Sequence, residues 1–95
     1  MEVIREDNGH EGAFKAINLE IEIAEMTYIW NGKDKIIIDH TEVNPEFEGQ
    51  GVGKNLFVHA VDFARKNNVK IVPVCPFVAA LCQRDPDVKD VLANY

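Results

Sequence analysis

A glycine-rich segment between an apolar strand pattern and an amphipathic helix pattern is the feature that most restricts how this chain can fold. The segment occupies positions 49–54 and reads Gly-Gln-Gly-Val-Gly-Lys. Residues 35–43 before it contain three consecutive isoleucines and predict a strand that ends at Asn44-Pro45. Over residues 51–67 after it, apolar residues recur every three or four positions, which predicts a helix with one buried stripe. The centre of the chain is therefore a strand, a glycine-rich loop and a helix, in that order.

Strand patterns dominate the residues before this central unit. We expect strands over residues 2–6, 13–17 and 20–30, the last with a bulge near Ala24 and Glu25, where the apolar positions change from odd to even numbers. The pair Asn31-Gly32 predicts a hairpin with a type I′ turn, because both central residues of that turn need positive φ. The isoleucine run at positions 36–38 favours a fourth strand that is covered on both faces.

A fifth strand and two short helices are expected after the central helix. The strand covers residues 69–74 and runs parallel to the fourth, because a helix crosses between them. Pro76 begins a helix over residues 76–84, and Asp85 caps a last helix that ends near Ala93. We therefore predict one domain over residues 1–95 with a mixed α/β (α+β) fold, a mostly antiparallel sheet and the element order β-β-β-β-α-β-α-α.

The charge and composition of the chain exclude several classes of function. The net charge is −6 and the Lys and Arg residues are scattered, so we expect no nucleic-acid partner. No apolar run reaches the roughly 18 residues of a membrane span, and the chain begins without a signal-peptide pattern, so we expect a cytoplasmic protein without a membrane partner. The histidines and cysteines lack the paired short spacings of metal ligands, which predicts no metal site and free thiols.

The alternating glycines at positions 49, 51 and 53 predict a phosphate site. Glycine lets a backbone approach a ligand closely, and the free N–H groups at a helix N-terminus attract anions. The segment is not a Walker loop, because Glu48 stands at the first glycine position and Asn55 follows Lys54. It is not a dinucleotide fingerprint either, because the third glycine position falls on Lys54 or Leu56.

The stretch from Glu48 to Gly53 resembles the Arg/Gln-x-x-Gly-x-Gly/Ala pattern of the GNAT superfamily of N-acetyltransferases. That pattern lies between the fourth strand and the long helix of the family, and the approach to it over residues 39–46 is also similar. The resemblance covers roughly residues 20–90. It is closest to a subfamily of very small GNAT-like proteins with a histidine in the fourth strand and a Cys-Pro pair after the fifth, here His40 and Cys75-Pro76.

The resemblance implies that the chain binds acetyl-CoA (coenzyme A). In the family the pyrophosphate rests on the loop amides, the pantetheine arm pairs with the end of the fourth strand, and the fourth and fifth strands splay apart to admit it. Glu48 replaces the Arg or Gln of the family and is expected to weaken binding, because it places an anion beside the pyrophosphate. The cofactor-binding residues that the resemblance implies are Thr41, Val43, Gly49, Gln50, Gly51, Val52, Gly53 and Lys54.

Cys75 is the candidate nucleophile. It precedes Pro76 at the expected start of a helix, where helix amides favour a thiolate, and transfer of an acetyl group between two sulfur atoms is nearly isoenergetic. The alternative is a small buried cysteine at a strand end, and packing is also the interpretation that we favour for Cys82. His40 shares a strand face with the isoleucines at positions 36 and 38, so it is either a core residue or the base for Cys75.

The sequence leaves other acid and base groups open. Larger members of the family often carry a tyrosine on the helix after the fifth strand, where this chain has Phe77 and Leu81 and reaches no tyrosine before Tyr95. Glu25 and Glu42 are either bases for a direct transfer or solvated strand carboxylates.

Three functions are compatible with these residues. The first is an acetyl-CoA-dependent N-acetyltransferase that acts on an unidentified amine, directly or through Cys75. The second is a non-catalytic module or sensor that binds CoA or acetyl-CoA, and the third is an interaction protein that kept the fold and lost the ligand. The bare edge of the first strand predicts a monomer or a weak homodimer.

Overall fold

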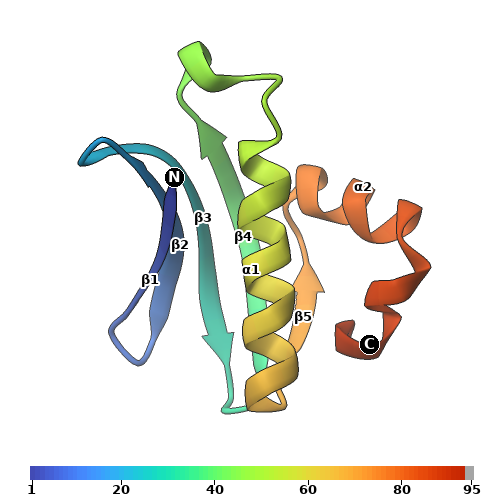
Figure 1. Cartoon of the computed structure of the whole chain (residues 1–95). Helices are drawn as coiled ribbons and strands as arrows, with labels where there is room; N and C mark the ends of the chain where they lie inside the picture. The colour runs from blue at the N-terminus through green and yellow to red at the C-terminus, as the bar shows by residue number, and fades with distance from the viewer. Residues whose placement is uncertain (94–95) are drawn as a thin grey trace.

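The computed structural model describes residues 1–93 and contains a five-stranded sheet with the strands in chain order (Figure 1). Neighbouring strands are antiparallel except for the fourth and fifth, which are parallel. These relations confirm the predicted mixed, mostly antiparallel sheet. The strands are β1 (Glu2–Asp7), β2 (Glu11–Asn18), β3 (Ile21–Asn31), β4 (Lys35–Val43) and β5 (Lys70–Pro73).

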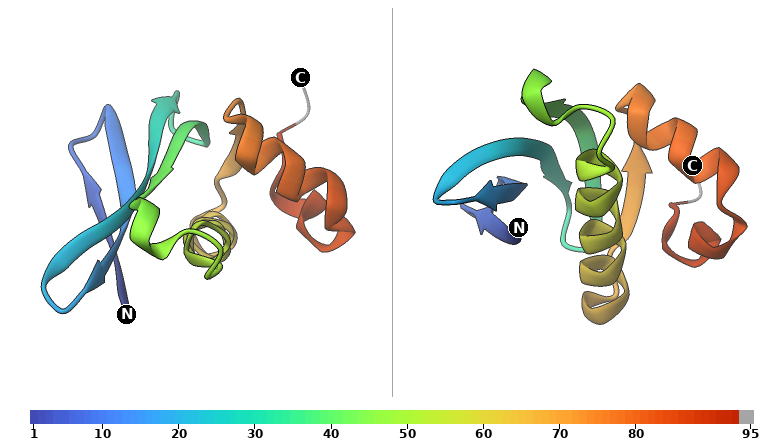
Figure 2. Two further views of the ribbon diagram at one scale, coloured as in Figure 1. Left: turned by 90° about the horizontal axis from the view of Figure 1, so that it is seen from above. Right: turned by 45° about the horizontal axis from the view of Figure 1, so that its top comes forward.

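Helix α1 (Val52–Asn67) connects β4 to β5 and covers one face of the sheet (Figures 1 and 2). Its apolar stripe meets the inward side chains of β2, β3 and β4, among which Met26, Ile36 and Ile38 are fully buried. Helix α2 (Pro76–Arg84) and the 3-10 helix η2 (Pro86–Val91) pack against the same core beside α1. No helix among residues 1–93 is long and apolar enough to cross a membrane.

The last predicted helix is shorter and of a different kind than expected. Asp85 caps it by accepting a hydrogen bond from the Asp87 amide at 2.9 Å, as predicted, but the turn is a 3-10 helix that ends at Val91. Beyond it, Leu92 pairs with Ile71 in a parallel bridge, and the Ala93 amide donates to the Ile71 carbonyl at 2.9 Å. The chain extends along β5 because this edge offers unpaired backbone groups. Tyr95 lies outside the described residues.

Two turns differ from the expectation. Asn31 pairs with Lys35 inside the β3–β4 ladder, so the hairpin has a three-residue connection in which Gly32 alone has positive φ. The predicted type I′ turn at Asn31-Gly32 is therefore wrong, although the hairpin is present. The two-residue turn lies instead between β2 and β3, where Leu19 and Glu20 take φ values of 50° and 69°. Glu20 thus belongs to a turn and not to the third strand.

The predicted bulge in the third strand is present about one residue earlier than expected. Ala16 pairs with Ala24 and Ile17 pairs with Glu22, so Ile23 is the extra residue of β3. Ile23 and Ala24 are both buried as a result, and the inward face changes from odd to even positions.

The expectation that the fourth strand is covered on both faces is wrong. Ile36 and Ile38 are fully buried beneath α1, whereas Ile37 points to the other side and is only half-buried. Both helices pack on the side of Ile36, which leaves the side of Ile37 without a helical layer among residues 1–93 (Figure 2).

Candidate functional site

A groove of about 480 Å³ lies where the end of β4 meets the start of α1 and the first turns of α2. It brings together most of the residues that the sequence analysis assigned to cofactor binding. Of that set, Val52 is buried in the core, and the side chain of Gln50 turns back toward the Glu46 carbonyl at 3.5 Å. The groove is lined by Thr41, Val43, Phe47, Glu48, Gly49, Gly51, Gly53, Lys54, Phe77 and Leu81.

The groove opens where β4 and β5 part. Their ladder ends at the pair Ile38 and Pro73, as the predicted splay requires. The amides of Val74 and Cys75 then both donate to the Ile38 carbonyl, at 3.1 and 2.8 Å, which turns the chain away from β4. Within residues 1–93, positions 39–43 of β4 consequently have a partner strand on the β3 side alone. Their other edge offers free backbone groups to a ligand.

The loop before α1 is shaped by glycines that need left-handed backbone angles. It begins with the 3-10 helix η1 (Pro45–Phe47), which Asn44 caps by accepting from the Glu46 amide at 2.9 Å. Gly49 and Gly51 then both have φ of 78°, a value that side chains strongly disfavour. Gly51 is also the N-cap of α1 and has no side chain to accept from the first amides of the helix. The N-terminus of α1 is therefore free to bind an anion.

Gly53 is a glycine for a different reason. A Cβ atom at this position would lie 2.8 Å from Cζ of Phe77, so the ring of α2 rests directly on the first turn of α1. Phe77 is 42% exposed and forms the wall of the groove opposite β4. The alternating spacing predicts one role for all three glycines, whereas two serve the backbone conformation and the third serves helix packing.

Two charged residues lie in the lining of the groove. Glu48 is exposed at the end of η1, and Lys54 is exposed on the first turn of α1. The carboxylate that departs from the family pattern thus does line the groove. The helix amides and Lys54 would stabilise an anion at the α1 N-terminus, whereas Glu48 would repel it.

Cys75 lies beside Thr41 across the point where the strands part. The buried Cys75 thiol donates a weak hydrogen bond to the Thr41 hydroxyl oxygen at 3.5 Å. Cys75 is the N-cap of α2, as predicted, and its carbonyl accepts from the Ala79 amide at 2.9 Å. A side chain predicted to bind the cofactor and the predicted nucleophile therefore meet. The resemblance implies a role for the backbone of Thr41, whereas the contact of its hydroxyl with Cys75 is visible only in the structure.

His40 does not lie on the face that sequence alternation predicts. Thr27 pairs with His40 and Tyr28 pairs with Ile38, so Asp39 is an extra residue that reverses the alternation of β4. His40 consequently faces away from α1, with its side chain 60% exposed and its Nε2 3.7 Å from the Glu42 carboxylate. The prediction that His40 shares a face with Ile36 and Ile38 is wrong. The structure does not bring His40 to Cys75, which is buried on the side of α1.

The remaining sequence candidates lie outside the groove. Cys82 is buried in the core, and this burial, with a smaller contribution from Asp85, raises the pKa of its thiol, in agreement with a packing role. Glu25 and Glu42 stand opposite each other on β3 and β4, on the face away from α1. Among residues 1–93, no three His, Cys, Asp or Glu side chains gather in a way that could hold a metal ion.

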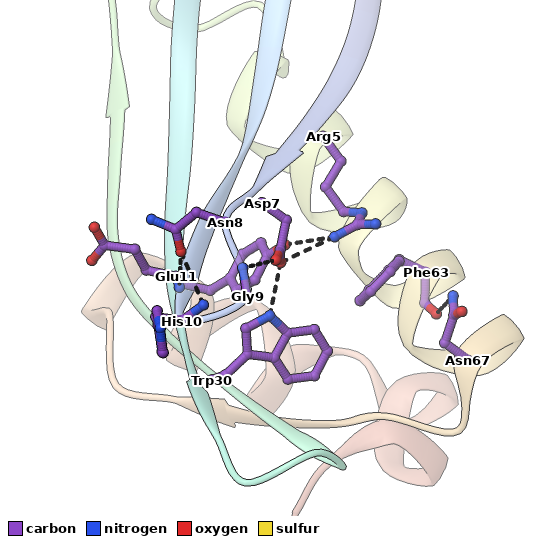
Figure 3. A network of polar contacts seen from close by, with 10 residues as sticks. Arg5, Asp7, Asn8, Gly9, His10, Glu11, Trp30, Phe63 and Asn67 are labelled. Atoms are coloured by element: carbon purple, nitrogen blue, oxygen red, sulfur yellow. Dashed lines mark hydrogen bonds and ion pairs between the residues drawn. The ribbon is translucent and has the colours of Figure 1, made fainter.

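A second polar cluster at the other end of β3 has no counterpart in the sequence analysis (Figure 3). One oxygen of Asp7 accepts hydrogen bonds from the Tyr28 hydroxyl at 2.6 Å, the Trp30 indole at 2.7 Å and the Arg5 guanidinium at 3.1 Å. Arg5 also lies over the ring of Phe63 on α1, 4.3 Å from its centroid. The cluster thereby joins the edge strand β1 to the sheet centre and to the helix.

The partners of this cluster shift its pKa values in opposite directions. Partial burial opposes ionisation of Asp7, but hydrogen bonds from Tyr28, the Gly9 amide and Trp30, with the charge of Arg5, hold the pKa of this carboxyl below its usual value. Burial and the hydrogen bond to Asp7 raise the pKa of Tyr28 to about 12. Asp7 is therefore ionised and Tyr28 neutral over the ordinary range of pH.

Known proteins share this fold and this sequence pattern. A family model described as GCN5-related N-acetyl-transferase matches residues 14–91. Protein NATD1 of Xenopus tropicalis is 30% identical over 63 residues, which make up 66% of this chain and 58% of that protein. The chain thus spans little more than half the length of this curated relative.

Solved structures agree with the family match. A GCN5-like protein from Staphylococcus aureus, determined in solution by NMR, is 32% identical with a TM-score of 0.70, and the match covers 97% of this chain and 89% of that one. The aminoglycoside N-acetyltransferase AAC(6')-Iy, solved in complex with CoA, is 16% identical with a TM-score of 0.59, over 81% of this chain and 67% of that one. The second likeness shows the fold alone.

Proposed function

Because the chain belongs to the GCN5-related N-acetyltransferase family, we propose that it binds acetyl-CoA in the groove at the end of β4 and transfers the acetyl group to an amine. The observation that carries the proposal is the uncapped N-terminus of α1, which opens onto a groove bordered by an unpaired strand edge. These are the two kinds of backbone site that a pyrophosphate and an amide-containing arm require.

The residues of the groove fit the two polar parts of this cosubstrate. The amides at positions 50–54 suit the pyrophosphate, and Lys54 adds a positive charge. The free edge of β4 near Thr41 and Val43 suits the two amides of the pantetheine arm. Phe77, Val43 and Leu81 supply the apolar contacts that such an arm needs along its length. A structure of AAC(6')-Iy with CoA supports this assignment at the level of the fold.

Cys75 offers a route for the acetyl group through the protein. The acetyl carbon would form a bond with the Cys75 sulfur as its bond to the CoA sulfur breaks, and CoA would leave as a thiol with the proton from Cys75. An amine would then attack the acetyl-cysteine and restore the thiol. Thr41 is the side chain that contacts this sulfur and would orient it. Direct attack of the amine on the bound thioester is the other route.

A second candidate function is a CoA or acetyl-CoA sensor without turnover. Two observations favour it: Phe77 lines the groove where larger relatives often carry a tyrosine acid, and Glu48 places a negative charge at the phosphate end. A sensor would hold the cosubstrate at the same amides and would leave Cys75 unmodified.

Intact mass spectrometry after incubation with acetyl-CoA separates these alternatives. The proposal with Cys75 as carrier predicts a gain of one acetyl group that is absent in Cys75→Ala and retained in Cys82→Ala, the matched buried cysteine. Release of CoA on addition of amines, without an adduct, would indicate direct transfer. Binding without either signal would indicate the sensor, and absence of binding would contradict both functions.

A further inference from the structure

The face of the sheet opposite α1 lies open over β2, β3 and β4 within residues 1–93 (Figure 2). An apolar strip crosses it near the β3–β4 turn, because Ile29 pairs with Ile37 and Ile37 with Val72 in neighbouring strands. Ile29 is 42% exposed and the other two are half-buried. A sheet face of this kind is usually covered by another layer of structure.

Two shallow hollows run along this open face. The first, of about 500 Å³, extends from the end of β1 across β2 and β3 to Asp39 of β4. The second, of about 360 Å³, lies beside the bulge in β3 and extends to Glu42 and Asn44. Glu25 lines both, so the two hollows meet at this residue. Together they form one path that ends at Asn44 and Pro45, where the chain leaves β4 for the loop before α1.

The path carries an excess of negative charge. Its carboxylates are those of Glu6, Asp7, Glu11, Glu22, Glu25, Asp39 and Glu42. Lys15 is the one cation among the lining residues, and it already contacts Glu6 at 2.7 Å, Glu22 at 3.2 Å and Glu25 at 3.9 Å.

Glu25 and Glu42 add a specific conflict to this excess. They stand directly opposite each other in the β3–β4 ladder, and like charges in such a pair repel. A cation between them would relieve the repulsion. Nε2 of His40 lies 3.7 Å from the Glu42 carboxylate on the same strand.

We propose that this open face docks an extended, lysine-rich peptide segment, and that such a segment is the acetyl acceptor. Adjacent strands lie about 4.8 Å apart, so the carboxylates from β1 to β4 span roughly 14 Å, the reach of about five extended residues. Lysine stems would cover the apolar strip while their ammonium groups meet the carboxylates. Shallow hollows that are open along one side fit an extended peptide better than they fit a small amine, which needs an enclosed pocket. The acceptor role rests on the proposed function, whereas the docking does not.

Fluorescence anisotropy with a labelled decapeptide of alternating lysine and glycine tests the docking. We expect Glu25→Gln with Glu42→Gln to weaken peptide binding about tenfold at low salt. Physiological salt should also lower the affinity of the unchanged protein for the peptide. The matched control is Asp62→Asn with Asp87→Asn, which removes the same charge from the α1 side of the molecule and should leave affinity nearly unchanged. A glutamate–glycine decapeptide should not bind.

Three outcomes would overturn the proposal. The first is that the lysine peptide does not bind, and the second is that both double variants lose affinity for it equally. The third is that spermidine displaces the peptide at concentrations that match the affinity of the peptide, which would indicate a small polyamine site. Titration of acetyl-CoA into the same proteins keeps the two proposals apart. Loss of acetyl-CoA binding with intact peptide binding would contradict the proposed function, and the reverse would contradict the docking. With both intact, the mass of the peptide after incubation with acetyl-CoA should rise by acetyl groups.

Discussion

Phe77 of α2 lies directly over Gly53 of α1, so that a Cβ atom on Gly53 would come within 2.8 Å of the ring. This contact fixes the position of α2 relative to α1 and so sets the width of the groove between α2 and β4. The groove therefore keeps its shape only with glycine at position 53.

Gly53→Ala is expected to destabilise the protein by about 1–2 kcal/mol, because the Phe77 ring must move out of its place. In a Phe77→Ala background the same change should become neutral or stabilising by up to about 1 kcal/mol, because alanine favours a helix more than glycine does. Urea unfolding of the four proteins measures both effects. Equal effects of Gly53→Ala in the two backgrounds would show that the contact is unimportant.

The Asp7 cluster predicts a pH dependence of stability. Its carboxyl has a lowered pKa in the folded chain, so its contribution is complete above the pKa of the unfolded chain, about 3.9, and is lost as the pH falls through the folded value. Asp7→Asn should cost about 1–2 kcal/mol at neutral pH, since it removes an ionised acceptor from three donors.

Unfolding of Asp7→Asn between neutral and acid pH provides the measurement. The difference from the unchanged protein should begin to shrink below about pH 4, where Asp7 of the unfolded chain becomes protonated, and should be lost only once the pH falls below the lowered pKa of the folded chain. The control is Asp34→Asn, which removes a carboxylate 3.6 Å from Lys35 on an exposed turn and should change stability by less than about 0.5 kcal/mol. A difference for Asp7→Asn that stays constant with pH would argue against the cluster.

The turn between β2 and β3 stores conformational strain. Leu19 and Glu20 both have positive φ, and Leu19 is 88% exposed, so neither packing nor backbone preference explains these residues. Replacing them together, Leu19→Asn with Glu20→Gly, should stabilise the protein by about 1–2 kcal/mol and raise Tm by roughly 4–8 °C per kcal/mol. Leu19→Ala serves as the control, because it keeps the unfavourable angle and should give no gain. A loss of stability in the double variant would mean that Leu19 makes a stabilising contact in the folded protein, despite its exposure.

Glu48 is expected to limit the affinity for acetyl-CoA. Glu48→Gln should tighten binding about fivefold, or about 1 kcal/mol, because it removes an anion from the phosphate end of the groove. Glu46→Gln is the matched control, since Glu46 is exposed on η1, two residues before Glu48, and does not line the groove. Calorimetric titration at two salt concentrations would record the change, which should be smaller at high salt. Equal affinities of the two variants for acetyl-CoA would show that Glu48 does not limit binding.

The elements that border the groove can be predicted from the sequence because their determinants are local. The glycine spacing, the strand before it and the helical period after it all lie within about 35 consecutive residues, and each has a known physical meaning. Cys75 was placed correctly because Pro76 marks the start of a helix.

The remaining features depend on relations that alternation and spacing do not contain. One extra residue, Asp39, turns His40 away from Cys75, and nothing in the run of residues around it marks a bulge. Asp7 meets Tyr28 and Trp30 across 21 and 23 positions, so their cluster appears only once the strands are in register. The isoleucine at position 37 resembles its neighbours in sequence, although it faces the open side of the sheet.

Amide NMR spectra of the ¹⁵N-labelled protein during titration with acetyl-CoA test the central claim most directly, since they report both binding and its place. The account predicts the largest shifts at the amides of residues 50–54 and 41–43, around the N-terminus of α1 and the unpaired edge of β4. Desulfo-CoA should give the same loop shifts, because it carries the same pyrophosphate. Saturable shifts confined to other surfaces, or a spectrum that does not change, would contradict the assignment of this groove to acetyl-CoA.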